Sequence, residues 1–346
     1  MKRILVIRKH NHLGDMLCSL PLYAALRARW SDARIDLLAA PTAYPVPLAE
    51  INPYLHDILF LRKDGPLALP RLLWRIRQRR YDMVIVPSTI RHSRSAHLIA
   101  RASGAPVRVG VRSYDGVPNP DRAALTHAID TRWSDGPVHQ LWRNLAIADA
   151  AGCAPAGDPL ATRIPVSAAA VAEAGRVLAA LPADGPIVGV HVGAGKRANV
   201  WPAGRFAATL RALRGDGPLS VLLTAGAMDA DEVEAVEREL RREGIPLLLL
   251  RDAPIPLLSA VLRRLALYLC NDTGTMHVAA FSGAPVLALF GPTPAAEWAP
   301  LQARCRAIVS PDASMEGISV DEVLDAGRAM LAAWREQRPR IDEREQ

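Results

Sequence analysis

The chain has 346 residues, of which 50% are hydrophobic and 22% are charged, with a formal net charge of +7. This composition is typical of a globular protein and excludes a disordered one, and the length allows two domains with a core each. No apolar run reaches the roughly 20 residues of a membrane span, and the N-terminal apolar stretch 4–7 is shorter than the about 7–15 residues of a signal peptide, so we expect a cytoplasmic protein.

The first half of the chain alternates between apolar runs and segments with helical spacing of apolar residues. The runs predict strands at 2–8, 34–39, 57–61, 82–86 and 107–111, and the spacing predicts helices at 17–30, 70–80 and 93–101. Pro21 either kinks the first of these helices or follows its true start near Ser19. The alternation predicts a parallel sheet with helices on its faces.

The second half repeats this rhythm. Strands are expected at 187–192, 219–224, 247–250, 267–271 and 285–290, and helices at 167–181, 202–213, 231–242, 257–264, 275–282 and 320–334. Pro202 is expected at the first position of its helix, and the charged tail after Trp334 is expected to fray. The segment 152–165, rich in Gly, Pro and Ala, predicts a junction. We therefore expect domains at 1–165 and 166–319, followed by a terminal segment at 320–346.

Ligands of open α/β sheets bind beyond the carboxyl ends of the strands, so the loops that follow strands are the candidate sites. The first, KHNHLGD, follows the first strand and contains His12 and Asp15. Two interpretations of Asp15 stay open, a cap of the next helix and a general base for an incoming hydroxyl. His12 is either an acceptor contact or an ordinary surface group.

The second loop, GAGKRANVW, follows the first strand of the second half. Gly193 allows a ligand to approach the backbone closely, and Lys196 and Arg197 supply positive charge for phosphate. The loop matches neither the Walker spacing nor the dinucleotide fingerprint.

The third loop, NDTGTMH, joins a strand to a helix. Free amides and the helix dipole at such a junction bind an anion without a metal. The alternative, a plain N-cap, explains one residue and not the cluster. The candidate donor-binding residues in this loop are Asp272, Thr273, Gly274, Thr275, Met276 and His277. The turn FGPTP follows the final expected strand on the same side of the sheet.

Positive charge is concentrated in one part of the first half. Ten arginines lie between residues 71 and 112, where Asp82 is the only acid. The segment is either a solvated face or a surface for an anionic partner. Arg91, His92 and Arg94 follow a strand and are candidate acceptor contacts, whereas the arginines of helix 70–80 face solvent or a membrane surface.

Three segments together resemble the bacterial lipopolysaccharide heptosyltransferase family, the inverting ADP-heptose-dependent enzymes of glycosyltransferase family 9. They are ILVIRKHNHLGDMLCSLPLYAALR, GVHVGAGKRANVWPAGRFAA and CNDTGTMHVAAFSGAPVLALFGPTP. The third is close to the family signature D-T-G-x-x-H-x-A-A followed by G-P-T. The likeness runs from residue 1 to about residue 300.

The resemblance implies a GT-B fold, in which two Rossmann-like domains face a cleft and the final helix packs back toward the first domain. It implies that the N-terminal domain binds the acceptor and the C-terminal domain the nucleotide sugar. Asp15 matches the catalytic base, the D-T-G-x-x-H residues match donor phosphate contacts, and Asp229 matches an acidic ribose contact. The family lysine two residues before W-P is replaced by Asn199, and Lys196 is its expected substitute.

The expected function is the metal-independent, inverting transfer of a heptose or related sugar from an ADP-sugar to a lipopolysaccharide core or related glycan. No cofactor and no metal ligand set are expected, because no C-x-x-C pair is present and the expected donor loops offer cations and helix amides for the phosphates. The expected partners are the nucleotide sugar, an anionic glycolipid acceptor and the inner face of the inner membrane, but no nucleic acid. Two alternatives stay open, a GT-B sugar-nucleotide epimerase and a catalytically silent GT-B binding protein.

Overall fold

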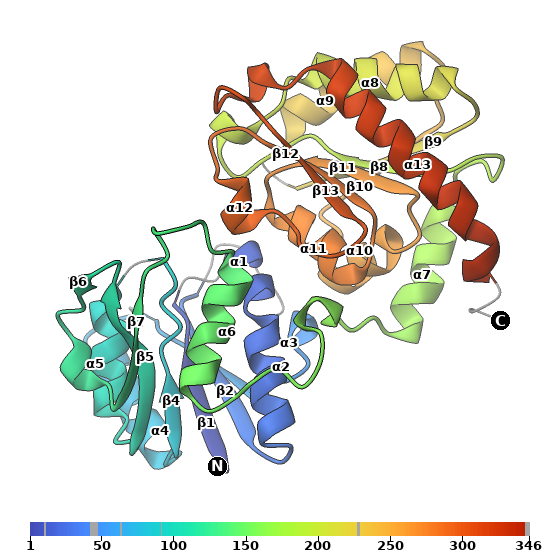
Figure 1. Cartoon of the computed structure of the whole chain (residues 1–346). Coiled ribbons are helices and arrows are strands. Elements are labelled where there is room, and N and C mark those ends of the chain that lie inside the picture. Colours follow the sequence, from blue (N-terminus) through green and yellow to red (C-terminus); the bar gives the residue numbers. More distant parts are fainter. Residues whose placement is uncertain (10–11, 42–47, 63, 91, 227–228, 343–346) are drawn as a thin grey trace. The chain divides into compact units, whose positions relative to one another are not determined.

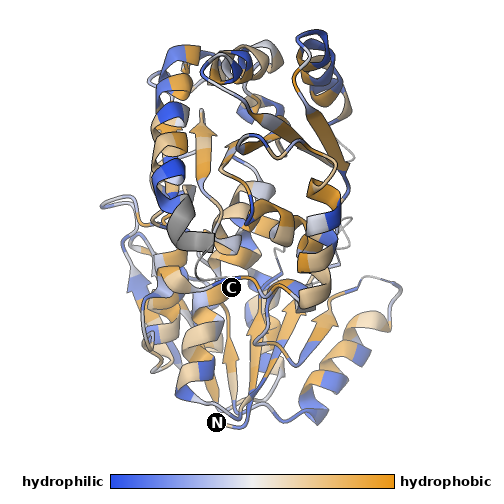
Figure 2. Cartoon of the chain, turned by 90° about the vertical axis from the view of Figure 1, so that its right-hand side faces the viewer, coloured by the Kyte–Doolittle hydropathy of each residue, from blue (hydrophilic) through white to orange (hydrophobic). Residues whose placement is uncertain are grey.

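The computed structural model describes all residues except 10–11, 42–47, 63, 91, 227–228 and 343–346 (Figure 1). It divides into two compact units, Met1–Thr162 and Arg163–Gln346, which we call unit 1 and unit 2. Each unit is a mainly parallel sheet covered by helices, and Figure 2 shows that the strands of both sheets are mainly hydrophobic. Such strands are typical of a sheet that is buried on both faces.

The sheet of unit 1 has the strand order β3-β2-β1-β4-β5-β6, and β7 also pairs with β5. All pairs are parallel except β5 with β6. The strands are β1 (Arg3–Ile7), β2 (Arg34–Ala39), β3 (Asp57–Phe60), β4 (Met83–Ile85), β5 (Val107–Tyr114), β6 (Val117–Pro118) and β7 (His127–Thr131). The first five agree with the expected strands to within a few residues, whereas β6 and β7 were not expected.

Helices cover both faces of the unit 1 sheet (Figure 1). On one face, α4 and α5 bury Leu72, Ile76 and Ile99 in a core with β1 and β4. The helices are α1 (Leu13–Cys18), α2 (Leu20–Arg29), α3 (Leu48–Ile51), α4 (Ala68–Gln78), α5 (Arg94–Ala102) and α6 (Gln140–Ala150). The helix expected at 17–30 is two helices, because the chain breaks at Ser19 and Pro21 lies in the first turn of α2.

The sheet of unit 2 has the order β10-β9-β8-β11-β12-β13, and every pair is parallel. The strands are β8 (Ile187–His191), β9 (Ser220–Ala225), β10 (Leu247–Arg251), β11 (Leu267–Asn271), β12 (Val286–Phe290) and β13 (Cys305–Val309). The first five confirm the expected strands. The edge strand β13 was not expected, because its burial is only partial and its sequence carries Arg306.

The helices of unit 2 are α7 (Ala168–Leu178), α8 (Ala203–Gly215), α9 (Ala230–Arg242), α10 (Ile255–Leu262), α11 (Gly274–Ser282), α12 (Ala295–Trp298) and α13 (Val320–Asp342). Pro202 is the N-cap of α8 and not its first residue. The tail was expected to fray after Trp334, but α13 continues to Asp342, since Arg335, Glu336 and Gln337 are strong helix formers. Helix α13 packs on α8, and Arg328 pairs with Asp216 at 2.7 Å.

Both sheets change direction at one place in their strand order. In unit 1 the order reverses between β1 and β4, and in unit 2 between β8 and β11. Loops that leave the sheet on either side of such a point open a crevice at its carboxyl edge, where ligands of α/β proteins bind. The candidate ligand-binding loops are therefore those after β1, β4, β8 and β11. Among the described residues, no helix has the length and apolarity needed to cross a bilayer.

Candidate functional site

A pocket of about 170 Å³ lies at the reversal point of unit 1. The loop after β1 and the first turn of α1 contribute one wall, and the loop after β4 contributes the other. The polar residues that line the pocket are Arg8, Lys9, His12, Asp15, Ser88, Thr89 and Ser93. The walls also carry Ile7, Pro87, Ile90 and Ala96, so the carboxylate and the two cations lie among apolar side chains.

Asp15 is held in the pocket by a buried ion pair. Its Oδ1 accepts a hydrogen bond from Nη2 of Arg8 at 3.0 Å, and both side chains are at least 90% buried. Nη1 of Arg8 donates to Oδ1 of Asn144 on α6 at 3.0 Å and to the carbonyl of Pro87 at 3.2 Å. Arg8 therefore links the carboxylate to the loop after β4. The N-cap of α1 is His12, so Asp15 does not occupy the capping position that one interpretation gave it.

Of the four residues expected to contact the acceptor, the three that the structure describes are not gathered in one place. His12 is exposed and lines the pocket beside Asp15. His92 instead lies with Nε2 2.7 Å from Oδ2 of Asp121 and its ring 5.0 Å from that of His97. Arg94 is exposed at the start of α5, and Arg91 lies outside the described residues. Only His12 shares the Asp15 pocket in the described part of the chain.

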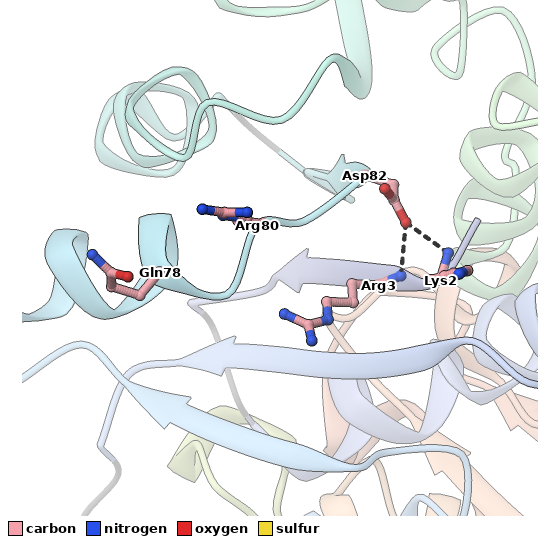
Figure 3. A pocket seen from close by; sticks show the side chains of 5 residues that line it. All are labelled: Lys2, Arg3, Gln78, Arg80 and Asp82. Atoms are coloured by element: carbon pink, nitrogen blue, oxygen red, sulfur yellow. Dashed lines mark hydrogen bonds between the residues drawn. The ribbon is translucent and has the colours of Figure 1, made fainter.

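A larger hollow, of about 490 Å³, lies at the opposite edge of the same sheet, where β1 and β4 begin (Figure 3). Its Asp82 carboxylate accepts hydrogen bonds from the backbone amides of Lys2 and Arg3, at 2.6 and 3.0 Å. The Lys2 amide is the main reason why the pKa of Asp82 lies below its ordinary value. Because the carboxylate secures the start of β1, and the hollow is at the amino edge, we assign it a structural role.

In unit 2 the side chain of Asn199 joins three loops at the reversal point. Its Nδ2 donates to Oδ2 of Asp272 at 2.9 Å and to Oγ1 of Thr293 at 3.0 Å. Burial raises the pKa of Asp272, while the hydrogen bond from Thr293 and the charge of Lys196 oppose that rise. Lys196 is exposed and close enough to act on this carboxylate, and Arg197 is exposed next to it.

A second buried amide fixes the backbone of the same loops. Nδ2 of Asn271, at the end of β11, donates to the carbonyls of Val192 and Gly193 at 2.8 and 3.2 Å. Its Oδ1 accepts from the backbone amide of Trp201 at 3.1 Å, and the indole of Trp201 donates to the carbonyl of Ile318. Both ends of the loop 193–200 are thereby tied to the end of β11. Sequence reasoning did not single out Asn271, although its place at the exit of an apolar strand was a usable signal.

The D-T-G-x-x-H cluster forms the first turns of α11. Thr273 is the N-cap and makes no side-chain capping bond, and Asp272 precedes the helix. The plain-cap interpretation is therefore wrong, and the first amides of α11 receive no side-chain cap. Gly274 and Thr275 are partly exposed at this end, whereas Met276 and His277 are buried. The ring of His277 lies 6.3 Å from that of Trp298, edge to face.

Asp229 is packed against the loop after β8. Its Oδ2 accepts from the amide of Gly226 at 2.7 Å, and it is the N-cap of α9. A Cβ atom at Gly193 would overlap Oδ1 of Asp229, so only glycine fits at that position. The expected donor residues Gly193 and Asp229 are thus direct neighbours.

His191 was missed by the sequence reasoning, because it lies inside the apolar run IVGVHV and looks like a core residue. Its Nδ1 is 3.0 Å from the carbonyl of Thr224, which indicates that Nδ1 carries the proton, and its Nε2 is 3.6 Å from Oδ2 of Asp229. Burial lowers the pKa of His191, and the charge of Asp229 opposes this effect. The His191 imidazole therefore lies directly beside the Asp229 carboxylate.

Residues 70–322 match the family model described as glycosyltransferase family 9 (heptosyltransferase). Lipopolysaccharide heptosyltransferase 2 of Salmonella typhimurium is 27% identical over 321 residues, which cover 88% of this chain and 87% of that protein. The family 9 glycosyl transferase of Veillonella parvula gives a TM-score of 0.77 at 20% identity, with 96% and 97% of the two chains covered. ADP-heptose LPS heptosyltransferase II of Escherichia coli gives 0.75 at 23% identity, with 96% and 99% covered. These two solved structures confirm the expected GT-B class of fold.

Proposed function

The chain belongs to glycosyltransferase family 9, the heptosyltransferase family, and on that basis we propose that it transfers a heptose or related sugar from an ADP-sugar to a lipopolysaccharide core acceptor. The enzyme is a glycosyltransferase of the heptosyltransferase type. The proposed donor is the one for which the Escherichia coli relative is named. The observation that carries the proposal is the joining of the loops after β8, β11 and β12 through Asn199, Asp272 and Thr293.

We assign the donor to unit 2. Lys196 and Arg197 are exposed cations, and the charge of Lys196 acts on Asp272 just before the uncapped end of α11. Amides at a helix N-terminus bind phosphate groups. Asp229 is placed to accept hydrogen bonds from ribose hydroxyls, since a carboxylate can accept from two donors at once. Thr273, Gly274 and Thr275 contact the diphosphate in this arrangement, and His277 is buried in the same turns. Met276 was also expected to contribute its amide, but that amide donates to the Thr273 carbonyl at 3.2 Å.

We assign the acceptor to unit 1, where Asp15 is the general base. Its carboxylate takes the proton from an acceptor hydroxyl, and the hydroxyl oxygen attacks the anomeric carbon on the face opposite to the departing diphosphate. The bond between that carbon and the phosphate oxygen breaks, so the configuration inverts. The growing negative charge on ADP is stabilised by Lys196, Arg197 and the α11 amides, without a metal ion.

The acceptor is expected to be anionic. His12 lines the Asp15 pocket, and Arg94 is an exposed cation at the start of α5. Together with Arg91 and His92 we propose these residues as contacts to phosphate or carboxylate groups of the lipopolysaccharide core. Because that acceptor is a glycolipid, peripheral contact with the inner face of the inner membrane is part of the proposal.

The function is tested by incubating the full chain with ADP-heptose and a heptose-acceptor lipopolysaccharide core, with and without EDTA. We expect ADP release that depends on the acceptor, survives EDTA and gives a product of inverted anomeric configuration by NMR. A panel with UDP- and GDP-sugars tests the choice of nucleotide. Conversion of the donor to an epimer without acceptor would support the epimerase alternative, and binding without any turnover would support a silent binding protein.

A further inference from the structure

The outer side of α4 and α5 is unusual for a surface that faces water. On α4, Leu67 just before the helix and Trp74 in its middle are 57% and 64% exposed, and on α5 Leu98 is 50% exposed. Leu67 and Trp74 are two helical turns apart, so they project from the same side of α4. The opposite side of α4 is the one that buries Leu72 and Ile76 against the sheet. Three large apolar side chains therefore point away from the core.

Arginines flank these apolar side chains. Arg71 and Arg75 are exposed on α4 on either side of Trp74, and Arg101 is exposed on α5 one turn from Leu98. Neither helix contains an acidic residue. Within the described part of the chain, none of these three arginines has a carboxylate partner. We call the set Leu67, Arg71, Trp74, Arg75, Leu98 and Arg101 the α4–α5 face.

We infer that the α4–α5 face binds the surface of an anionic phospholipid bilayer. Arginines are attracted to anionic headgroups, and Trp and Leu side chains enter the boundary between headgroups and acyl chains. A nucleic acid would be matched by the charge but would leave Leu67 and Leu98 without a suitable contact. The two leucines and the single tryptophan therefore favour a lipid surface.

The inference specifies the peripheral membrane contact that forms part of the proposed function. The face is built from α4 and α5, which share one side of the sheet, and the Asp15 pocket lies at the sheet's carboxyl edge. None of the residues of this face lines that pocket or belongs to the donor loops. No sugar donor is needed to measure membrane binding, so a failed membrane test and a failed transferase test are distinguishable.

The experiment is flotation of the full chain with vesicles of phosphatidylcholine alone or with added phosphatidylglycerol. We expect binding only to the anionic vesicles and its loss in high salt. Reversing charge in Arg71→Glu/Arg75→Glu should weaken binding by about 25-fold or more, since each basic side chain near the surface contributes about fivefold. Trp74→Ala should weaken it by about tenfold.

Two matched controls separate this face from general effects. Trp142 on α6 is also exposed, at 41%, so Trp142→Ala removes a comparable ring from a helix outside the α4–α5 face. Arg211→Glu/Arg238→Glu changes the net charge as much as the α4 variant does, but in unit 2. Circular dichroism confirms that each variant folds. No binding to anionic vesicles, or an equal loss in the controls, would overturn the inference, as would tighter binding to a single-stranded RNA than to vesicles.

Discussion

The side-chain amide of Asn199 donates to the Asp272 carboxylate at 2.9 Å, at the point where the sheet of unit 2 reverses its strand order. The resemblance to the heptosyltransferase family described above predicts a lysine at that position. A neutral donor at this position orders the carboxylate without neutralising it. The charge needed for a diphosphate must therefore come from elsewhere, and Lys196 is the cation whose field reaches Asp272.

Replacing Asn199 with alanine removes two hydrogen bonds from a buried cluster. We expect Asn199→Ala to lower the free energy of unfolding by about 1–3 kcal/mol, the usual penalty for leaving a buried acceptor without its partner. ADP binding should weaken as well, because the loops after β8, β11 and β12 are no longer joined. Asn199→Asp should weaken it further, because it adds a second carboxylate next to Asp272. Denaturant unfolding and isothermal titration calorimetry with ADP measure the two effects. Wild-type affinity in Asn199→Ala would show that the cluster does not support the donor site.

The two glycines of the GAG motif should behave differently. A Cβ atom at Gly193 collides with Asp229, so Gly193→Ala must displace either the loop or the carboxylate and should reduce ADP affinity by about tenfold or more. A Cβ atom at Gly195 has no heavy atom within 4 Å, so Gly195→Ala is the matched control and should be nearly silent. Equal effects of the two substitutions would argue against the contact with Asp229.

Asp15→Asn keeps the shape of the side chain but removes the proposed base. We expect donor affinity to stay near the wild-type value while kcat falls by about 10²–10⁴. Asp32, exposed before β2, offers the same chemical change outside the pocket, and Asp32→Asn should leave kcat unaltered. Acceptor-dependent ADP release measures both rates. A near-normal kcat in Asp15→Asn would restrict this residue to its ion pair with Arg8.

Lys196 is the proposed substitute for the missing family lysine. Lys196→Ala should weaken ADP-sugar binding or slow ADP departure by about 1.5–3 kcal/mol, the range of a hydrogen bond to a charged group. Arg197→Ala should have a smaller effect, because its charge does not reach Asp272 in the same way. Donor titration and single-turnover rates distinguish binding from departure. If Lys196→Ala had no effect and Arg197→Ala had a large one, the main phosphate contact would be Arg197 and not Lys196.

The ionised carboxylate of Asp272 should lower the stability of unit 2, although the proposed donor site needs it. Burial raises its pKa above the ordinary 3.8, so its ionisation opposes folding. This destabilisation is absent at a pH below the pKa that Asp272 has in the unfolded chain. It is complete once the pH has risen above the pKa that Asp272 has in the folded chain. Asp272→Asn should therefore raise the melting temperature of unit 2 at pH 7 and lose this advantage near pH 3, while ADP-sugar turnover falls. Differential scanning calorimetry at both pH values measures the change, and a lower melting temperature at pH 7 would contradict the expected sign.

The strands and the loops that follow them were predictable because their signals are local. Apolar runs such as LYLCN are buried on both faces, and D-T-G at a strand exit identifies the start of α11 from sequence alone. The short strands β6 and β7 gave no such signal, because HAIDT is polar at both ends and all its residues but Thr131 are exposed or half-buried.

Contacts between segments that are far apart in the sequence could not be predicted. Arg8 meets Asn144 on α6, 136 residues later, and Asn199 meets Thr293, 94 residues later. No motif or regular spacing in the sequence indicates either of these two contacts. His92 was expected to contact the acceptor because it follows a strand, and its pairing with Asp121 could not be predicted from the sequence.

The first five strands of the two sheets have the same order, in which the third strand of each half lies at one edge, followed by the second, the first, the fourth and the fifth. Each half has its own hydrophobic core, and the division falls between Thr162 and Arg163. Under the proposed assignment, residues that select the sugar nucleotide and residues that select the acceptor are encoded in separate, contiguous stretches of the gene. Recombination near that boundary can therefore exchange one specificity and leave the other intact, a modular route to new pairings of donor and acceptor.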